Sequence, residues 1–359
     1  MPRITIDGKQ YELDDQVSIL QAASRFGIPI PTLCHHPKLT RFGGCRLCIV
    51  EIEGFPRPVT SCTTVITDGM VITTASPKLE ELRKLVVELM LSDHPNDCMR
   101  CEKAGECRLQ DLAYTYGANR DEYEGERRIY PKRDGNPFIE RDLEKCVMCG
   151  RCVKVCNEVQ GVEAIDFGYR GFKAKICTNF EDDLDCEFCG QCVAVCPTGA
   201  LTGKQWARKG RQEGARTVDT VCPYCGTGCI VTVHTKNNEI LKISSHDYAW
   251  NEGWLCVKGR FGYKFANSPY RLTRPLIREA PKKSVPDFID GEKELFREAS
   301  WEEALDLVAS RFSEIKKTHG ADALSGLSSA RCTNEENYIF QKFIRAAVGT
   351  NNVDHCARL

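Results

Sequence analysis

Near the start of the chain, apolar and polar residues alternate with a period of two on either side of an Asp7-Gly8 pair. This pattern predicts a β-hairpin, because Asp-Gly is a preferred two-residue turn. Ser18 then precedes an apolar stretch that ends at Gly27, which predicts a short capped helix. Further strand-like runs follow, so residues 1–78 are expected to form a β-grasp domain.

The apolar pattern changes to a helical period after Pro77. Apolar residues recur there at helical spacing: Leu79, Leu82, Leu85, Val86, Leu89 and Met90. Much later, Ser300 and Glu303 form a capping box ahead of another helical pattern. The strand and helix patterns around it follow the β-then-α order of a dinucleotide-binding sheet.

These patterns indicate an α+β multidomain fold, because 359 residues are too many for one core. The expected segments are the β-grasp domain 1–78, a helical segment 79–120, a two-repeat ferredoxin domain 138–209, a small β-rich domain 215–271, and the start of an α/β domain at 272–359.

Cysteine is the residue type that changes this picture, because the chain has 22 of them. The N-terminus lacks the apolar core of a signal peptide, and no apolar run is long enough to span a membrane. The sequence therefore favours metal binding over disulfides and a cytoplasmic location. A net charge of −1 argues against nucleic acid as a partner.

The first set of candidate ligands falls on predicted loops of residues 1–78. It consists of Cys34, Cys45, Cys48 and Cys62. Four thiolates suit a [2Fe–2S] cluster, and the Cys-x2-Cys pair can hold one iron. A zinc site with four thiolates is the alternative.

The second set follows the helical pattern and has only three cysteines. It reads His94-x3-Cys98-x2-Cys101-x5-Cys107. A [4Fe–4S] cluster needs a fourth ligand, so His94 is interpreted as that ligand rather than as a packed or solvated histidine. The spacings of these first two sets resemble those of the respiratory NADH dehydrogenase large subunit and of iron-only hydrogenases.

The third and fourth sets form an internal repeat. The runs are Cys146-x2-Cys149-x2-Cys152-x3-Cys156 and Cys186-x2-Cys189-x2-Cys192-x3-Cys196-Pro197. This is the spacing of bacterial two-cluster ferredoxins, in which the fourth cysteine of each run binds the other cluster. Cys196 is therefore assigned to the third set and Cys156 to the fourth. Asn157 stands where the run usually has proline, and Cys177 is interpreted as a buried small residue.

The fifth set has a spacing of its own. It reads Cys222-x2-Cys225-x3-Cys229, then 26 residues, then Cys256. This motif and the Cys-Val-Lys-Gly run resemble the N-terminal cluster domain of oxidoreductases that hold molybdenum or tungsten with two pterin guanine dinucleotides. Formate dehydrogenases and nitrate reductases belong to that family. The resemblance implies that Lys258 lies between cluster and pterin, balancing charge or bridging electrons.

The last residues, Gly349 to Leu359, resemble the segment that leads to the catalytic residue of formate dehydrogenases. In that family the metal-binding selenocysteine or cysteine follows directly, so no residue up to Leu359 is assigned a catalytic role. Cys356 is four positions too early to replace it. A stop read at a selenocysteine codon would explain this, and an arbitrary truncation is the alternative; the next codon decides.

Together the sets predict one [2Fe–2S] and four [4Fe–4S] clusters, or about 18 iron atoms per chain. The resemblance implies the electron-relay part of a formate dehydrogenase alpha subunit, which oxidises formate or reduces CO2 at a molybdenum or tungsten bis-pterin centre. Electrons would leave through the fifth set, the paired sets, the His94 set and the first set. The expected partner is an NAD(P)- or ferredoxin-linked flavin or iron–sulfur subunit, or a hydrogenase subunit.

Three other functions compete with this interpretation. An NADH:quinone oxidoreductase large subunit shares the first two sets and a cluster like the fifth, and an iron-only hydrogenase shares the first four. A stand-alone multi-cluster electron carrier is the third. The complete double run and the ending of the chain favour the formate dehydrogenase interpretation. The choice between molybdenum and tungsten, the direction of electron flow and the identity of the partner are not encoded in these motifs.

Overall fold

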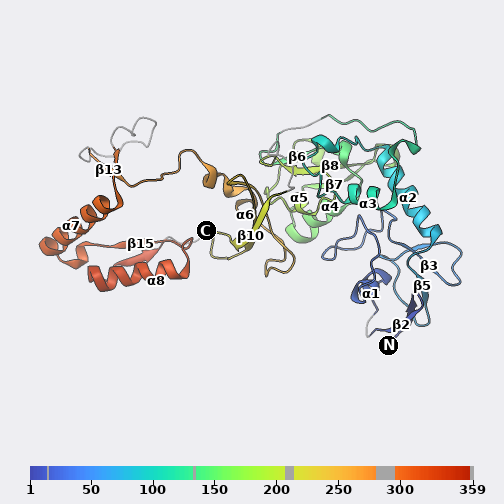
Figure 1. Ribbon diagram of the computed structural model, residues 1–359, viewed down its shortest axis with the longest axis horizontal. Helices are drawn as coiled ribbons and strands as arrows, with labels where there is room; N and C mark the ends of the chain where they lie inside the picture. The colour runs from blue at the N-terminus through green and yellow to red at the C-terminus, as the bar shows by residue number, and fades with distance from the viewer. Residues whose placement is uncertain (14–15, 132–134, 207–213, 280–295, 356–359) are drawn as a thin grey trace.

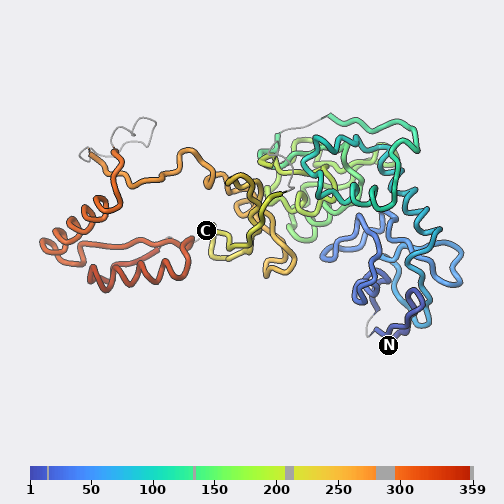
Figure 2. Tube along the Cα trace, in the orientation of Figure 1, coloured from blue at the N-terminus to red at the C-terminus, as the bar shows by residue number. Residues whose placement is uncertain are grey.

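The computed structural model describes residues 1–13, 16–131, 135–206, 214–279 and 296–355. The chain is extended along one axis (Figures 1 and 2). The domain that contains α1 and β2 lies at one end, and α7 and α8 lie at the other (Figure 1). The segments that carry the third, fourth and fifth sets lie between these ends.

The N-terminal domain is a five-stranded sheet with order β2-β1-β5-β3-β4. Its elements are β1 (Arg3–Ile6), β2 (Lys9–Glu12), α1 (Ile19–Arg25), β3 (Ile49–Ile52), β4 (Val59–Thr60) and β5 (Val71–Thr73). The expected hairpin is present, with Asp7 and Gly8 at φ 48° and 80° between antiparallel β1 and β2. Ser18 caps α1 through a capping box with Gln21. Ile4, Ile6 and the inner face of α1 lie in the same apolar core.

Two helices cover the loops that carry the first set. They are α2 (Pro77–Ser92) and α3 (Arg108–Tyr116). The expected helical period after Pro77 lies within α2, whose N-cap is Ser76. Val87 of α2 and Leu109 of α3 pack with Leu33 and Leu47, which adjoin cysteines of the first set. This packing brings the second set close to the first domain.

The ferredoxin-like segment contains two short antiparallel strand pairs and two short helices. Its elements are β6 (Ile139–Arg141), α4 (Arg151–Lys154), β7 (Ile165–Gly168), β8 (Lys175–Thr178), α5 (Gln191–Val195) and β9 (Leu201–Gly203). β6 pairs with β9 and β7 with β8, both antiparallel. Helices α4 and α5 begin at equivalent places in the two cysteine runs.

The two runs end differently. The first continues past its fourth cysteine as a π-helix, η4 (Val155–Gln160), whereas α5 stops at Cys196 before Pro197. Proline has no N–H group and its ring clashes with the preceding turn of a helix. Asn157 imposes neither restriction, so the first run extends as a helix instead of turning.

The β-rich segment is a three-stranded antiparallel sheet followed by a short helix. Its elements are β10 (Arg216–Val221), β11 (Ile230–Lys236), β12 (Glu239–Ser244) and α6 (Val257–Phe261). β11 and β12 are the two strands expected around Lys236-Asn237-Asn238. Cys256 is the N-cap residue of α6, so this helix begins directly at the fifth set.

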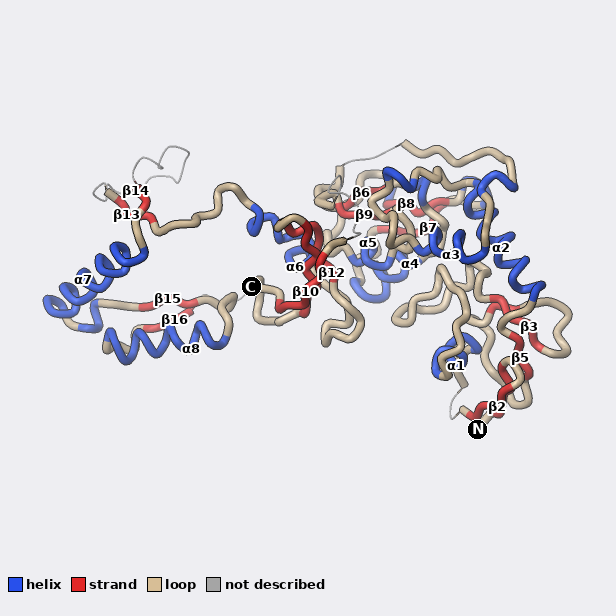
Figure 3. The backbone as a smooth tube through the Cα atoms, viewed as in Figure 1, coloured by secondary structure: helices blue, strands red, loops and turns tan. Residues whose placement is uncertain are grey.

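The C-terminal part contains a parallel β-α-β unit. Its elements are β13 (Leu276–Arg278), β14 (Phe296–Glu298), α7 (Trp301–His319), β15 (Gly326–Ser328), α8 (Asn334–Lys342), the π-helix η10 (Phe343–Val348) and β16 (Val353–His355). β15 pairs in parallel with β16, and α8 connects them. Ser300 caps α7 by accepting from the Glu303 N–H, but the other half of the expected capping box is not formed, because the Glu303 carboxylate pairs with Arg297. Figure 3 shows α7 and α8 apart from the other helices.

Among the described helices, none has the length and apolar character to cross a membrane.

Candidate metal centres

The first set is gathered in the interior of the N-terminal domain. All four of its cysteines are buried. Cys34 and Cys45 are hydrogen-bonded through their side chains, and this contact raises the pKa of Cys34 and lowers that of Cys45 to about 5. Cys62 lowers the pKa of Cys48 to about 7 in the same way. In each pair the hydrogen bond therefore favours one thiolate, at Cys45 and at Cys48, and thiolate is the form that binds iron.

Arg83 fixes the loop that carries Cys48. Its buried guanidinium donates to the carbonyl oxygens of Leu47 and Ile49, at 3.3 and 2.8 Å. A third bond of 2.8 Å reaches the carbonyl oxygen of Thr74. The backbone on both sides of Cys48 is therefore held from α2, at a distance of more than 30 residues in the sequence.

The second set contains a buried histidine with a free ring nitrogen. His94 Nδ1 accepts from the Asn96 N–H at 3.3 Å, while its buried Nε2 has no hydrogen-bond partner among the described residues. Burial lowers the pKa of His94 to about 4, so the imidazole is neutral near pH 7. Neutral imidazole is the form that ligates metals. An orphaned buried nitrogen is the arrangement that a metal ligand requires.

The cysteines of the second set lie near the same charged groups as His94. Asp97 and Lys145 are electrostatic neighbours of both His94 and Cys101. The thiols of Cys98 and Cys101 are in turn neighbours of Cys107. Lys145 forms ion pairs with Asp97 and Asp142. The His94 ring and the three thiols thus surround one polar region at the edge of the ferredoxin-like segment.

The cysteines of the two runs line two separate internal pockets. One is lined by Cys146, Cys149, Cys152 and Cys196. The other is lined by Cys156, Cys186, Cys189 and Cys192. The fourth cysteine of each run thus lies with the first three of the other, which is the grouping expected from the sequence. Burial raises the pKa of Cys146 to about 11 and that of Cys149 to about 12. Such thiols ionise at neutral pH only beside a strong positive charge, which bound iron supplies.

The fifth set lies where the β-rich sheet meets α6. The Cys222 N–H donates to the Cys229 carbonyl oxygen at 2.8 Å, and Cys225 and Cys256 are electrostatic neighbours of Cys222. Cys222 is buried, whereas Cys256 is exposed. Lys258 is exposed as well, on the helix that begins at Cys256. The fifth set is therefore buried on one side and open on the other.

The C-terminal part contacts this set through Tyr224. Arg331 Nε donates to the Tyr224 carbonyl oxygen at 3.1 Å, and the guanidinium lies 5.7 Å from the centre of the Tyr224 ring. Tyr224 lies between Cys222 and Cys225 in the sequence. Residues 296–355 therefore adjoin the fifth set. Cys356 lies outside the described residues, so the structure does not place it.

Within the described residues, no three His, Cys, Asp or Glu side chains are close enough to hold one ion. A cluster of several irons and sulfides keeps its ligands further apart than one ion does. The fit to clusters instead comes from the orphaned His94 nitrogen and from the two pockets that are each lined by four cysteines.

Two arginines that the sequence analysis did not identify link the sets: Arg151, which is half-buried, and Arg260, which is buried. Arg151 of α4 donates to the carbonyl oxygen of His35, the residue after Cys34. Burial lowers its pKa, and thiols of the third and first sets, led by Cys149, oppose that shift. The first set thus adjoins the third set directly, and not only through the His94 set as the expected electron order implied.

The second arginine, Arg260, is at the opposite end of the ferredoxin-like segment. Burial lowers its pKa to about 10, opposed by the thiols of Cys189, Cys192 and Cys256. The sequence gives a weak indication of both arginines, because each lies within four residues of a candidate ligand cysteine. Their long-range contacts could not be predicted from that position.

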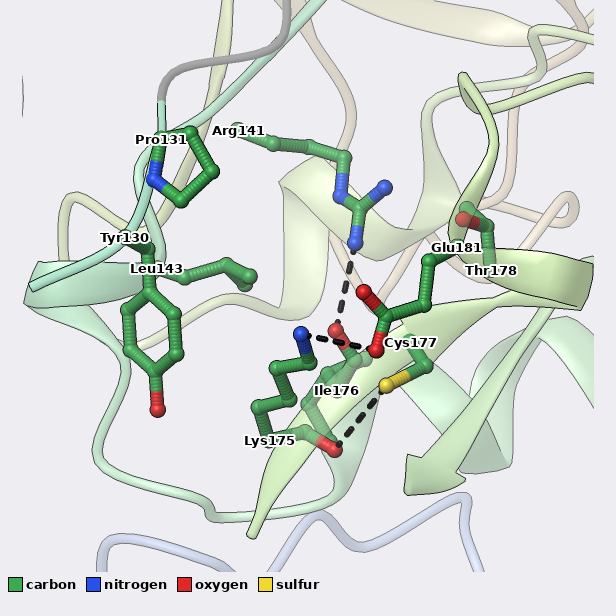
Figure 4. Close-up of a pocket in the computed structure, with 9 residues that line it drawn as sticks. All are labelled: Tyr130, Pro131, Arg141, Leu143, Lys175, Ile176, Cys177, Thr178 and Glu181. Atoms are coloured by element: carbon green, nitrogen blue, oxygen red, sulfur yellow. Dashed lines mark hydrogen bonds and ion pairs between the residues drawn. The ribbon is translucent and has the colours of Figure 1, made fainter. Parts of the chain in front are cut away.

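Cys177 lies outside all five sets, in a surface pocket of the ferredoxin-like segment (Figure 4). It is half-buried rather than buried as expected. Its thiol lies 3.9 Å from the Lys175 carbonyl oxygen and against Gly168, where an added Cβ would be 2.5 Å from the sulfur. Lys175 pairs with Glu181 at 2.9 Å. The pocket is therefore held by contacts among its own residues.

Five family models match consecutive parts of this chain. They are a 2Fe-2S iron-sulfur cluster binding domain at 2–77, an NADH-ubiquinone oxidoreductase-G iron-sulfur binding region at 83–122, an NADH-quinone oxidoreductase subunit 3 ferredoxin-like domain at 136–202, a molybdopterin oxidoreductase Fe4S4 domain at 215–268 and molybdopterin oxidoreductase at 271–359. The chain therefore carries a 2Fe-2S domain, several 4Fe-4S domains and molybdopterin oxidoreductase sequence.

Curated relatives match the whole chain but are much longer. The NADPH-Fe(3+) oxidoreductase subunit alpha of Geobacter sulfurreducens is 43% identical over 100% of this chain and 40% of its own length. An NADH-quinone oxidoreductase subunit of Rhizobium meliloti is 38% identical over 100% and 40%. A putative formate dehydrogenase of Staphylococcus aureus is 32% identical over 99% and 39%. The chain thus spans about two fifths of the length of these relatives.

A solved structure shares the fold of part of this chain. A chain of the NAD+-reducing [NiFe]-hydrogenase, in the H2-reduced state, aligns with a TM-score of 0.55 and 28% identity. The alignment covers 59% of this chain and 92% of that one.

Proposed function

We propose that this chain conducts electrons between a pterin-held metal and a redox partner. The proposal takes the chain to be the iron–sulfur electron-transfer portion of a molybdopterin oxidoreductase family subunit. Bound clusters would each take up and release one electron. The observation that carries the proposal is the division of eight repeat cysteines between two pockets of four. Such a pair serves electron transfer rather than substrate binding.

The proposed ligands are the twenty residues of the five sets. They are Cys34, Cys45, Cys48 and Cys62 for one [2Fe–2S] cluster, and for four [4Fe–4S] clusters His94 with Cys98, Cys101 and Cys107; Cys146, Cys149, Cys152 and Cys196; Cys156, Cys186, Cys189 and Cys192; and Cys222, Cys225, Cys229 and Cys256. These thiols are buried or half-buried, except the exposed Cys256, and together with a neutral buried imidazole they suit this role. The His94 ligand should give its cluster a higher potential than four thiolates would.

Lys258 is proposed to act on the open side of the fifth set. Its exposed side chain follows Cys256 by two residues. Arg331 and the C-terminal part adjoin the same set through Tyr224. A molybdenum or tungsten bis-pterin group bound by the longer protein on this side would have a cation beside it, which suits the phosphates of such a group.

For the whole protein, the proposed reaction is formate oxidation or CO2 reduction. This proposal is supported by the resemblance of the sequence of residues 349–359 to formate dehydrogenases. The second candidate is electron exchange with NADPH or NADH. It is favoured by the names of the Geobacter and Rhizobium relatives. The partner in either case is proposed to be a pyridine-nucleotide- or ferredoxin-linked subunit, or a hydrogenase subunit, as the aligned hydrogenase chain suggests.

Iron content and substrate tests examine these proposals separately. Anaerobically prepared chain should bind about 18 iron atoms and give paramagnetic signals after dithionite; colourless, zinc-loaded protein would contradict the relay. The 359-residue polypeptide alone should accept electrons without oxidising formate. In the longer protein with its pterin, formate-dependent dye reduction supports the first candidate, and NADPH-dependent reduction without formate activity supports the second.

A further inference from the structure

Two side chains connect the ferredoxin-like segment and the β-rich segment in opposite directions. Gln191 Nε2 donates to the Leu255 carbonyl oxygen at 2.8 Å. Arg260 Nε donates in return to the Cys189 carbonyl oxygen at 3.1 Å. Arg260 Nη2 also donates to Gln191 Oε1 at 2.8 Å, which joins the two links. Each acceptor carbonyl belongs to a ligand cysteine or directly precedes one.

Arg260 is deeply buried, with 1% of its surface exposed. A buried guanidinium is unfavourable unless its charge is compensated. Among the described residues no carboxylate forms an ion pair with it. Its stabilising electrostatic neighbours are the thiols of Cys189, Cys192 and Cys256. These cysteines come from the fourth and fifth sets, so the charge of Arg260 lies between two proposed clusters.

The backbone of the second run makes room for this side chain. Gly190 has a φ of 72°, and a Cβ added there would be 2.4 Å from Arg260 Cδ and 2.8 Å from the Phe261 ring. At the equivalent position of the first run, Gly150 has the same conformation but faces Phe167 and Phe42. The close approach of an arginine is therefore specific to the run that adjoins the fifth set.

We propose that Arg260 is a charge-bridging and positioning residue for electron transfer between the fourth and fifth sets. Its hydrogen bonds with Gln191 hold the two ligand loops together, and its charge favours the reduced state at both sites. One electron passes between the sets, with no proton or bond exchanged. The inference rests on the proposed function, because it requires clusters in both sets.

The physical basis is Coulomb interaction in a medium of low dielectric constant. A cluster gains negative charge on reduction, and a buried cation beside it stabilises that state. Removing the cation therefore lowers the reduction potentials of both neighbouring clusters. More distant clusters are affected less.

The test is a redox titration of the full chain, loaded anaerobically and monitored by electron paramagnetic resonance. Cys192→Ser and Cys225→Ser identify the signals of the fourth and fifth sets by their loss. Arg260→Gln should lower the equilibrium constant for reduction at both sets about tenfold, which is about 59 mV for one electron. Arg260→Lys keeps the charge and should leave both potentials near those of the wild type.

Arg83→Gln is the matched control. Arg83 is also buried and bonded to carbonyl oxygens, but it adjoins the first set. It should destabilise the protein without shifting the potentials of the fourth and fifth sets. Equal shifts in Arg83→Gln and Arg260→Gln would show a general effect of destabilisation and overturn the proposal.

Further outcomes separate the remaining cases. Unchanged potentials in a fully loaded Arg260→Gln variant overturn the inference. If that variant fails to bind its clusters, Gln191→Glu adds a negative charge 2.8 Å from the guanidinium and should lower the same potentials; no shift there overturns it. If neither Arg260→Gln nor Gln191→Glu binds its clusters, the result depends on Arg260→Lys. Cluster binding by Arg260→Lys would then support the charge role, and loss of the clusters in that variant too would contradict it. Wild-type chain without iron would instead refute the proposed function.

Discussion

The two cysteine runs of the ferredoxin-like segment have the same spacing but reach different parts of the molecule. In each run a glycine with positive φ, Gly150 or Gly190, follows the second cysteine and begins a short helix. The next residue is Arg151 in the first run and Gln191 in the second. Arg151 bonds to the loop of the first set, whereas Gln191 bonds to the loop of the fifth set.

This difference shows how a repeat can connect two unlike neighbours. The cysteines fix two equivalent helix starts, and in each run the residue after the glycine bonds to a loop of a neighbouring domain. What that residue meets depends on which domain packs there. The repeat thus links the N-terminal domain on one side to the β-rich domain on the other through equivalent positions.

The largest expected effect tests whether the fourth cysteine of each run binds the cluster of the other run. Cys156→Ser combined with Cys189→Ser should remove one [4Fe–4S] cluster, or about four iron atoms. Cys156→Ser combined with Cys149→Ser should remove both, or about eight, because these cysteines line different pockets. Iron analysis measures both. The opposite pattern would mean that each run binds its own cluster, and Cys177→Ser should lose no iron.

Asn157→Pro makes the first run resemble the second. The proline ring should break η4 inside a continuous helical stretch, which destabilises by about 3 kcal/mol. Thermal unfolding of the loaded protein measures the loss. Asn157→Ala, which keeps the backbone N–H, is the control and should lose far less. Equal stability of the proline variant would show that the two runs can end in the same way.

Alanine at the two glycines compares their surroundings. Both positions are strained for alanine by about 1–2 kcal/mol because φ is positive. Gly190→Ala must also displace the buried Arg260, so we expect a total of about 3 kcal/mol. Gly150→Ala meets the tip of Phe167, which is 39% exposed and can move. Chemical denaturation measures the free energy of unfolding of both variants. A larger loss in Gly150→Ala than in Gly190→Ala would contradict the expectation.

Arg151→Gln gives the first run the side chain of the second. The shorter side chain should lose the bond to the His35 carbonyl oxygen, which weakens local docking by about 2 kcal/mol. Hydrogen exchange of residues 34–40 should then become faster, while exchange near Leu255 stays unchanged. Unchanged exchange in 34–40 would mean that the neighbouring contacts, such as Lys38 with Asp247 at 3.1 Å, are sufficient.

Much of the local structure was predictable because its signals are short in sequence. The Asp7-Gly8 turn and the caps at Ser18 and Ser300 are present, since each depends on residues within a few positions. The continuation of the first run into η4 was not predicted, although Asn157 is unusual at its position. A missing proline removes a restriction on the backbone, but it does not say which conformation the chain then adopts.

The sequence by itself determined the candidate ligands, because the first three cysteines of one run must reach a common centre over a few residues. It also indicated that the fourth cysteines are exchanged, and the structure brings them together in that way. Only the tertiary structure decided that Arg260 meets Gln191 across 69 residues and that Arg151 meets His35 across 116. Such contacts depend on how whole domains pack, and domain packing sums many weak interactions that no local pattern records.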